Sequence, residues 1–360
     1  MIVQSVRLHR FELPLKRSLF VANTSVATRQ GVLLTVTTDS ALTASCEVSP
    51  LPGLHRETIG TVITELKEFK RRFTGRTLQQ VPDNWWGTPQ VIFKDFPAAP
   101  SVRFAIETVC LNLWAQQTGK KTSWFLGKPS AKSIRLNALL FGEPPTVIRQ
   151  AEKYIARGFR DLKIKVARHA LQDELDMLTR LLRELPHSVR VRLDANRSWT
   201  LEQAKALQSL PKERIEYVEE PLQNPYDIPA FYRATGIPVA LDESLTLPKA
   251  HELLKLPGVN ALVLKPTVLG ATETLRWAQW AERQRQKIIL SDTFSSGIGL
   301  NILAHWAAAL NSRAAHGLNT YDLLAEDLLN QPLNTDKGQL KLLPGHEINN
   351  RIRWSRLNEL

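Results

Sequence analysis

The sequence predicts an α/β protein: a modified TIM barrel of the (β/α)7β type that follows an α+β N-terminal unit. From residue 133 onward, apolar and β-branched runs alternate with segments of helical periodicity. Five of these runs end in charge, at Lys165, Asp194, Glu219, Asp242 and Lys265, and successive ends lie 23 to 29 residues apart. Each step has room for one strand, one loop and one helix, which indicates a series of βαβ units.

The first third of the chain has a different pattern. Strands are expected at 2–14, 30–37 and 42–48, and helices follow at 57–73 and 101–114. Strands that precede helices, rather than alternate with them, are typical of an α+β unit. We therefore assign residues 1–128 to a separate N-terminal domain.

The barrel itself is expected over residues 129–322. Its predicted strands are 133–139, 161–166, 189–194, 215–219, 238–242, 261–265, 287–291 and 314–317. Helices are expected between them, at 146–157, 173–185, 201–210, 271–285 and 299–310. Such a barrel surrounds one mouth with the C-terminal ends of its strands, where active sites are found. Residues 323–360 lack this periodicity and are expected to return toward the N-terminal domain.

Composition and charge narrow the class of protein. The 360 residues are 43% hydrophobic and 23% charged, as in soluble globular proteins. The net charge of +12 is scattered, and no zinc pattern, aromatic RNA-binding signature or basic repeat accompanies it. We therefore expect no nucleic-acid partner. The positive surface can instead steer a substrate that carries several carboxylates.

The start of the chain and its cysteines bear on location. Charged residues interrupt the first twenty positions, so no signal peptide is expected, and no apolar run is long enough to span a membrane. Cys46 and Cys110 are too few for a disulfide framework. These features predict a cytoplasmic protein without a membrane partner, and they leave open whether it is a monomer or a homodimer.

Three carboxylates end consecutive predicted strands: Asp194, Glu219 and Asp242. Hard oxygen ligands of this kind, with room for water and substrate oxygens, suit Mg²⁺. Each carboxylate alone could equally cap the following helix. Three in register, flanked by lysines, favour a metal site.

The lysines are the second unusual feature. Lys163 and Lys165 are two residues apart on a predicted strand, so they share a face, which in a barrel strand is the interior. A pair of lysines on a solvated strand face is the alternative, and it fits an edge strand better. Burial and the charge of Lys163 should lower the pKa of Lys165 and let it act as a base. Lys265 has the same context four strands on, so two bases would flank a metal-bound carboxylate, the geometry for removing an α-proton.

Short motifs extend through nearly the whole chain and carry a resemblance to a known family. They are RQG at 29–31, CEVSPLPG at 46–53, PSVRF at 100–104, KIK at 163–165, RLDANRSW at 192–199, EEP at 219–221, DES at 242–244 and KPT at 265–267. In this order they resemble the enolase superfamily, muconate-lactonizing-enzyme subgroup. Within that subgroup the chain is most similar to the proteobacterial o-succinylbenzoate synthases. The resemblance implies an enolase-like fold in which the N-terminal domain caps the barrel.

The resemblance also implies an activity. It is the dehydration of 2-succinyl-6-hydroxy-2,4-cyclohexadiene-1-carboxylate to o-succinylbenzoate in menaquinone biosynthesis, a hydro-lyase reaction. By this resemblance Lys165 removes the α-proton, an enediolate forms, and Lys165 then protonates the leaving hydroxyl in a syn elimination. Lys265 is the opposing lysine that stabilises the enediolate, and Lys163 is an auxiliary lysine. Asp194, Glu219 and Asp242 match the ligands of Mg²⁺, for which Mn²⁺ can substitute.

The same resemblance implies a substrate-binding set for a small dicarboxylate. Residues 49–53 correspond to a mobile loop that closes over the substrate, which we call the lid loop, and Ser291 and Gly317 match positions that hold the succinyl carboxylate. The full set is Ser49, Leu51, Pro52, Gly53, Leu139, Arg192, Ser291 and Gly317. Two departures concern recognition: Cys46 stands where a glycine is usual, and Ser295 stands where a glutamate is usual.

Two rival functions remain. An N-acylamino acid racemase or dipeptide epimerase on the same scaffold would use both lysines as acid–base catalysts, one on each face of the substrate. A barrel that had become a basic binding protein would not need the inner charged set at all. We rank the dehydratase first because of the CEVSPLPG segment.

Overall fold

The computed structural model describes residues 1–21, 24–78, 80–81, 83, 85–86, 93–126, 131–311 and 313–360. Within these ranges the N-terminal part forms an antiparallel sheet in the order β15-β1-β2-β3. Its strands are β1 (Val3–Val21), β2 (Thr24–Thr38), β3 (Thr43–Val48) and β15 (Asn358–Glu359). Helices α1 (Ile59–Phe73) and α2 (Pro100–Thr118) pack against β1, β2 and β3, and the short α3 (Thr122–Phe125) follows α2.

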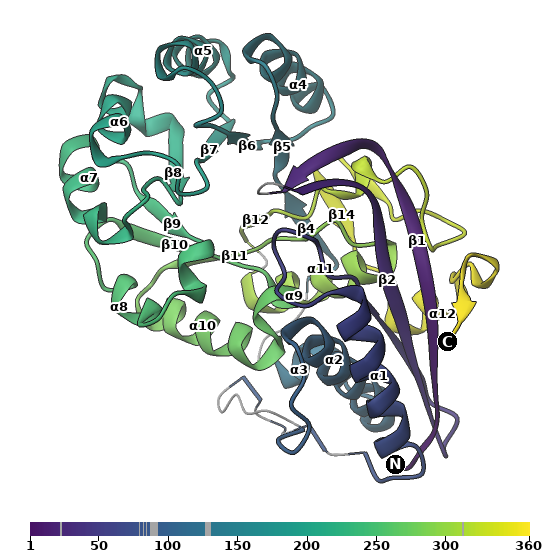
Figure 1. Ribbon diagram of the computed structural model, residues 1–360. Coiled ribbons are helices and arrows are strands. Elements are labelled where there is room, and N and C mark those ends of the chain that lie inside the picture. The colour runs from purple at the N-terminus through teal and green to yellow at the C-terminus, as the bar shows by residue number, and fades with distance from the viewer. Residues whose placement is uncertain are drawn as a thin grey trace.

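The middle of the chain forms the predicted barrel, with helices around a ring of strands (Figure 1). Seven described strands form a parallel sheet in the order β11-β10-β9-β8-β7-β6-β5. They are β5 (Ala138–Leu140), β6 (Asp161–Lys165), β7 (Arg190–Asp194), β8 (Ile215–Glu219), β9 (Val239–Leu241), β10 (Val259–Leu264) and β11 (Lys287–Leu290). The fold is therefore enolase-like: an N-terminal capping domain joined to a modified TIM barrel.

The first barrel strand is divided at Asn137. Its first half, β4 (Ser133–Leu136), pairs in parallel with β12 (Ala315–His316), whereas its second half, β5, pairs with β6. The Asn137 amide donates to the His316 carbonyl where the strand changes partner. A parallel bridge between Ser291 and Gly317 continues the ring from β11 to β12.

Helices separate the barrel strands in the expected order. They are α4 (Pro144–Ala156), α5 (Leu171–Glu184), α6 (Leu201–Lys205), α7 (Ile228–Thr235), α8 (Ala250–Leu253), α9 (Pro266–Leu269), α10 (Ala271–Arg283) and α11 (Gly297–Asn311). In β6, Leu162 and Ile164 are fully buried and alternate with Lys163 and Lys165. This period of two directs the apolar pair to the helix layer and the lysines to the barrel interior.

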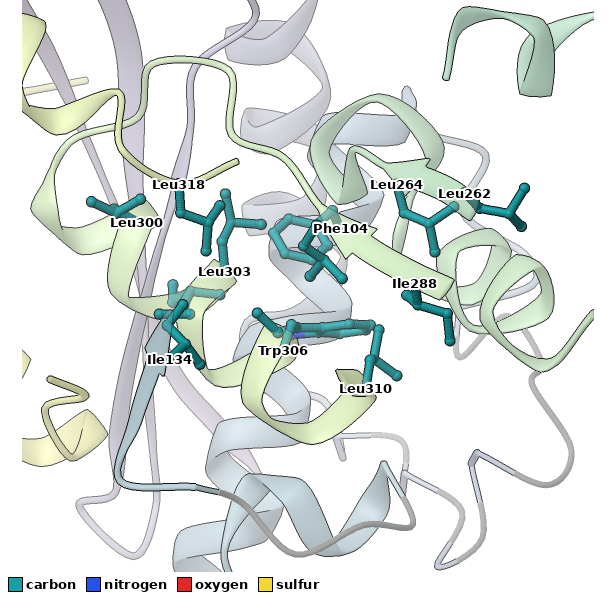
Figure 2. Packing of buried hydrophobic residues seen from close by; sticks show 14 of the residues in the cluster. Phe104, Ile134, Leu262, Leu264, Ile288, Leu300, Leu303, Trp306, Leu310 and Leu318 are labelled. Carbon is teal, nitrogen blue, oxygen red and sulfur yellow. The ribbon is translucent and has the colours of Figure 1, made fainter. Parts of the chain in front are cut away.

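The core continues across the boundary between the two parts. Figure 2 shows Leu303 and Trp306 of α11 beside Phe104, which comes from α2. The rings of Phe104 and Trp306 are 5.5 Å apart between centroids. Because α11 carries the capping domain on one side and the barrel strands on the other, this packing sets how the cap sits over the barrel.

The C-terminal segment touches both parts. Strands β13 (Thr335–Asp336) and β14 (Gln339–Lys341) form a hairpin, and β14 pairs antiparallel with β4. Helix α12 (Gly345–Asn350) follows, and β15 pairs with β1 at His9 and Arg10. The predicted limits 1–128, 129–322 and 323–360 stay an interpretation, and the limit at 128/129 lies outside the described residues.

Candidate active site

Strand ends bring the predicted catalytic and metal residues to one mouth of the barrel. Neighbouring strands pair Lys165 with Asp194 and Asp194 with Glu219 in register. Asp242 directly follows β9 and Lys265 directly follows β10. Because β6 and β10 are separated by three strands in the sheet order, Lys165 and Lys265 approach the carboxylates from different sides.

Ion pairs join the lysines to the carboxylates in this mouth. The Lys163 ammonium donates to Glu219 Oε1 at 2.7 Å and lies 2.8 Å from Asp194 Oδ2. The Lys165 ammonium donates to Asp194 Oδ2 at 2.6 Å. Lys265 contacts Asp242 in the same way. Asp194 and Glu219 are fully buried, so these charges interact in a medium of low dielectric constant.

Burial and neighbouring charges shift the pKa values of this group strongly. Burial raises the pKa of Glu219 well above its usual value, and the charge of Asp194 raises it further. Burial alone would raise the pKa of Asp194, but Lys163 and Lys165 hold it far below its usual range. Burial alone would likewise lower the pKa of Lys163, yet Asp194 and Glu219 hold it well above its usual value.

Lys265 corrects one expectation from the sequence. The same context was expected to lower its pKa, but the pKa of Lys265 is raised: Asp242 and Glu243 outweigh the effect of burial. The sequence argument counted burial and like charge and left out the carboxylates, and Asp242 contacts the Lys265 ammonium directly.

The carboxylates fit a divalent cation by their chemistry. Glu219 Oε2 is buried without a hydrogen-bond partner in the described part of the chain, although unpaired buried oxygens of this kind are costly. The raised pKa of Asp242, caused first by burial, likewise indicates a charge that needs further compensation. No three His, Cys, Asp or Glu side chains of the described residues form a ready-made cage, because lysine ammonium groups lie between the acids.

Asn196 is a site residue that sequence reasoning missed. Its Oδ1 accepts from the Lys165 ammonium at 2.8 Å, and its Nδ2 donates to Glu243 Oε1 at 2.7 Å. Arg168 Nη2 donates to the same oxygen at 2.9 Å. Asn196 has a left-handed φ of 44°, which asparagine tolerates better than most residues. Its place two residues beyond a strand-end aspartate was the available signal.

Glu220 supports Asp242 from behind rather than joining the ligands. Its Oε1 accepts from the backbone amides of Asp242 and Ser244, at 2.7 and 2.8 Å, and its Oε2 accepts from the Ser244 hydroxyl. Burial, followed by the charge of Glu243, raises the pKa of Glu220 to about 7. The sequence assigned Glu220 no ligand role, and these bonds fix the backbone at Asp242 instead.

Three predicted substrate residues lie around the same mouth. Leu139 is paired in register with Lys163, so it belongs to the same barrel face. Ser291 and Gly317 lie side by side across the bridge between the seventh and eighth strands. A Cβ on Gly317 would lie 3.0 Å from the Ser291 hydroxyl oxygen, so glycine leaves space beside that hydroxyl.

Arg192 lies deeper in the barrel than the other predicted substrate residues. It precedes Asp194 by two positions on β7, so it occupies the next inward-facing position below the acid. Its guanidinium donates to Glu216, to Asn137 Oδ1 and to the Ala315 carbonyl. Arg192 Nη2 is buried and finds no partner among the described residues.

The lid loop, residues 49–53, lies between the capping domain and the barrel loops. Leu51 is buried in a small apolar cluster with Leu15, Leu19, Val26 and Leu324. Pro52 and Gly53 are exposed. Gly53 has a left-handed φ of 84°, and a Cβ there would lie 2.4 Å from the Val21 carbonyl oxygen. The loop is thus held against the end of β1.

Comparison with known protein families shows to which family the chain belongs. The family described as Enolase C-terminal domain-like matches residues 146–348, more than half of the chain. The family described as MenC, N-terminal domain, matches residues 3–113. The chain belongs to the MenC family of the enolase superfamily. The resemblance inferred from the short motifs is thereby confirmed.

Curated relatives agree with this membership. Over 329 residues the MenC-family chain is 28% identical to the o-succinylbenzoate synthase of Klebsiella pneumoniae strain 342, covering 90% of this chain and 92% of that protein. It is also 33% identical over 263 residues to Protein PHYLLO, chloroplastic, of Arabidopsis thaliana. That match covers 64% of this chain and only 15% of the plant protein.

Solved structures share the fold. The dipeptide epimerase of Enterococcus faecalis V583, complexed with Mg and the dipeptide L-Leu-L-Tyr, superposes with a TM-score of 0.82 at 22% identity. The match covers 96% of this chain and 98% of the epimerase. Enzymes with this fold thus include one that is complexed with Mg. In the described ranges of the MenC-family chain, no helix has the length and apolar character to cross a bilayer.

Proposed function

We propose that this enzyme dehydrates 2-succinyl-6-hydroxy-2,4-cyclohexadiene-1-carboxylate to o-succinylbenzoate. The observation that carries the proposal is the pair of lysines, Lys165 and Lys265, on different sides of three buried carboxylates at the barrel mouth. The similarity to named o-succinylbenzoate synthases over nine-tenths of their length supports this substrate among those of the superfamily.

Lys165 is proposed to move the proton. As a neutral amine it accepts the α-proton of the substrate carboxylate, and the electrons of the C–H bond shift toward that carboxylate. The same ammonium then donates its proton to the leaving hydroxyl on the same face, the C–O bond breaks, and water departs as the ring becomes aromatic. Asn196 accepts a hydrogen bond from Lys165 and holds its amine in place.

The remaining charged residues are proposed to stabilise and orient the substrate. Asp194, Glu219 and Asp242 would hold Mg²⁺, with Mn²⁺ as a substitute. When bound, the cation supplies positive charge where the substrate carboxylate gains negative charge. Lys265 contributes a second positive charge from the opposite side of the substrate, and Lys163 balances Asp194 and Glu219 from below.

The second carboxylate of the substrate is proposed to lie between Ser291 and Gly317. The Ser291 hydroxyl can donate there, and the missing Cβ of Gly317 leaves room for the ligand. Arg192 Nη2 is unpartnered in the described structure and provides positive charge deeper in the barrel, toward Ala315. Arg192 would thus attract the succinyl end at longer range or through water.

An epimerase is the second candidate function. The favouring observation is the same pair of lysines, because one base on each face is what inversion at a carbon requires. Solvent deuterium would then enter both enantiomers of an N-acylamino acid or dipeptide, and Lys265→Ala would abolish the exchange on one face. In a dehydratase that works from one face, replacement of Lys165 alone abolishes the proton transfer.

An assay of turnover tests the proposal directly. The loss of absorbance of the cyclohexadiene substrate is measured once with Mg²⁺ and once with EDTA. We expect Mg²⁺-dependent turnover, and a loss of roughly 10³-fold or more in Lys165→Ala, because a positioned acid–base group contributes about 10²–10⁴-fold. Lys287→Ala removes an exposed lysine at the other end of a barrel strand and is the matched control, with turnover retained. Activity retained by Lys165→Ala would remove it as the base.

A further inference from the structure

Two buried charged residues of the capping domain have no part in the proposed chemistry. Arg29 on β2 is 1% exposed and Glu47 on β3 is 5% exposed. Burying charges in a protein is costly unless each one is paired and hydrogen-bonded. Both side chains reach the point where the lid loop meets the segment that follows barrel strand β11.

Arg29 ties two loops together through their backbones. Its Nη2 donates to the Ser49 carbonyl at 2.6 Å and its Nη1 donates to the Pro50 carbonyl at 3.1 Å, both at the start of the lid loop. Its Nε donates to the carbonyl of Phe294, three residues beyond Ser291, at 3.1 Å. The rigid fork of a guanidinium suits this task, because it holds several acceptors in one fixed geometry.

Glu47 makes a second tie between the same two segments. Its Oε1 accepts from the Ser49 hydroxyl at 2.6 Å. On the barrel side it accepts from the amide and hydroxyl of Ser296 and from the amide of Gly299, at the start of α11. A carboxylate at a helix N-terminus also interacts favourably with the helix dipole. The Glu47 carboxylate therefore accepts hydrogen bonds from both the lid loop and the barrel.

Close approach of the backbone leaves this junction little freedom. A Cβ on Gly299 would lie 2.8 Å from Glu47 Oε2, and a Cβ on Gly31 would lie 2.9 Å from the Ser49 Cβ. Asp292 accepts from both the amide and the hydroxyl of Ser295, which fixes the chain between Ser291 and Ser296. Contacts this tight transmit a shift on one side to the other.

We propose that Arg29 and Glu47 are positioning residues that fasten the base of the lid loop to the 291–299 segment. The base of the lid loop and the Ser291 side of the site then keep a fixed position relative to each other. The kinetic part of this inference rests on the proposed function. The mechanical part concerns the backbone at 49–56 and can be tested without substrate.

Hydrogen–deuterium exchange of the full chain measures the mechanical part. The amides of Leu54 and His55 donate to the Leu51 carbonyl and report on the closed loop. We expect Arg29→Met and Glu47→Gln to speed their exchange about tenfold, because each variant removes bonds that hold the loop base. In Glu47→Gln, the side-chain NH₂ group replaces an oxygen that accepted hydrogen bonds, so it faces hydrogen-bond donors and those bonds are lost.

Glu107→Gln is the matched control. Glu107, on α2, is also a buried carboxylate that accepts hydrogen bonds from the start of a barrel helix, through the amide and hydroxyl of Thr272. It lies on another element than the lid loop, so its replacement should leave exchange at 54–55 unchanged. If Arg29→Met fails to fold, Ser296→Ala decides, because it removes the hydroxyl donor to Glu47, together with the acceptor of the Ile298 amide, and keeps the backbone donors to Glu47. Unchanged exchange at 54–55 in the folded variants overturns the proposal.

Steady-state kinetics then separate positioning from general loosening. We expect KM to rise roughly tenfold in Arg29→Met, with kcat changed less than threefold and partial recovery in Arg29→Lys, because the loop orders the binding site rather than the proton transfer. Faster exchange in a protein that does not turn over this substrate would sustain the mechanical inference and reject the proposed function. Equal losses of kcat in Arg29→Met and Glu107→Gln would reject the positioning role.

Discussion

At the scale of single residues, the charge of a side chain is decided by neighbours that are remote in sequence. Lys163 shares a strand with Lys165, and from sequence that proximity dominated the argument. In the structure, two carboxylates from the next two strands lie within 2.8 Å of the Lys163 ammonium and raise its pKa. Remote neighbours also set the charge of histidines. A buried histidine can be neutral in the folded state, because burial lowers its pKa.

His55 carries the residue-scale prediction. Its Nδ1 accepts the Leu51 amide at 3.0 Å, and burial lowers the pKa of His55 to about 4 from the usual 6.5. The folded state disfavours the protonated ring, so stability is fully present above pH 6.5 and is lost as the pH falls toward 4. The loss is at most about 3 kcal/mol by linkage.

Denaturant unfolding between pH 7 and pH 4 measures this effect. The difference in unfolding free energy between the wild type and His55→Asn should shrink as the pH falls, because the asparagine oxygen can accept the Leu51 amide at either pH. His187→Asn, which changes an exposed histidine, serves as control. A difference independent of pH would contradict the prediction.

At the scale of elements, the conformation of the lid loop depends on the residues that it packs against. A Pro/Gly-containing loop was expected from sequence to close over substrate, and the structure shows its contacts: Leu51 lies in an apolar cluster with the ends of β1 and β2. The first barrel strand is a second case. It was expected as one strand over 133–139, but it is divided because its two halves have different neighbours, β12 and β6.

Gly53→Ala is the element-scale prediction. At a φ of 84° and with the Val21 carbonyl 2.4 Å from the new Cβ, the loop must move away from β1. We expect KM to rise roughly tenfold with kcat little changed, as for a displaced lid. Proline at this position would be worse, since its ring fixes φ near −65°.

Gly75→Ala is the control for the loop variant. Gly75 has a similar φ of 79°, but a Cβ there has no neighbour within 4 Å. It should lose about 1 kcal/mol of stability from left-handed strain with KM unchanged. An equal rise of KM in both variants would mean that strain, rather than the lid contact, is responsible.

At the scale of the whole molecule, two parts of different architecture share one core and one site. The apolar packing of α2 on α11 and the buried acids Glu47 and Glu107 join the cap to the barrel. A cation at the barrel mouth would add to this stability, because a ligand that binds only the folded chain stabilises it by mass action.

Thermal unfolding with and without Mg²⁺ is the whole-molecule prediction. After treatment with EDTA, Mg²⁺ at about 100 times its Kd should stabilise the fold by about 2.7 kcal/mol. For a chain of 360 residues that corresponds to a rise in Tm of about 4 °C. Asp242→Asn should lose most of this rise, whereas Asp336→Asn, which changes an exposed acid on β13, should keep it. A full rise in Asp242→Asn would contradict its assignment as a ligand.

The sequence by itself determined the order of the elements and the position of the charged residues along them. Strand periodicity placed Lys165, Asp194 and Glu219 at strand ends, and parallel strands necessarily bring such ends to one mouth. The family could be inferred from motifs because those motifs are local runs of residues. The identity of Asn196 as a partner of Lys165 could not, because asparagines after strands are common and only the fold selects one.

Only the tertiary structure decided which groups, remote in sequence, each buried charge contacts. Arg29 and Phe294 are 265 residues apart, and no periodicity relates them. Their contact depends on how the capping sheet docks on α11, which is the sum of many weak apolar contacts over distant parts of the chain. The pKa values of the buried lysines and acids follow from the side-by-side pairing of the barrel strands, since low-dielectric surroundings strengthen each interaction between charges.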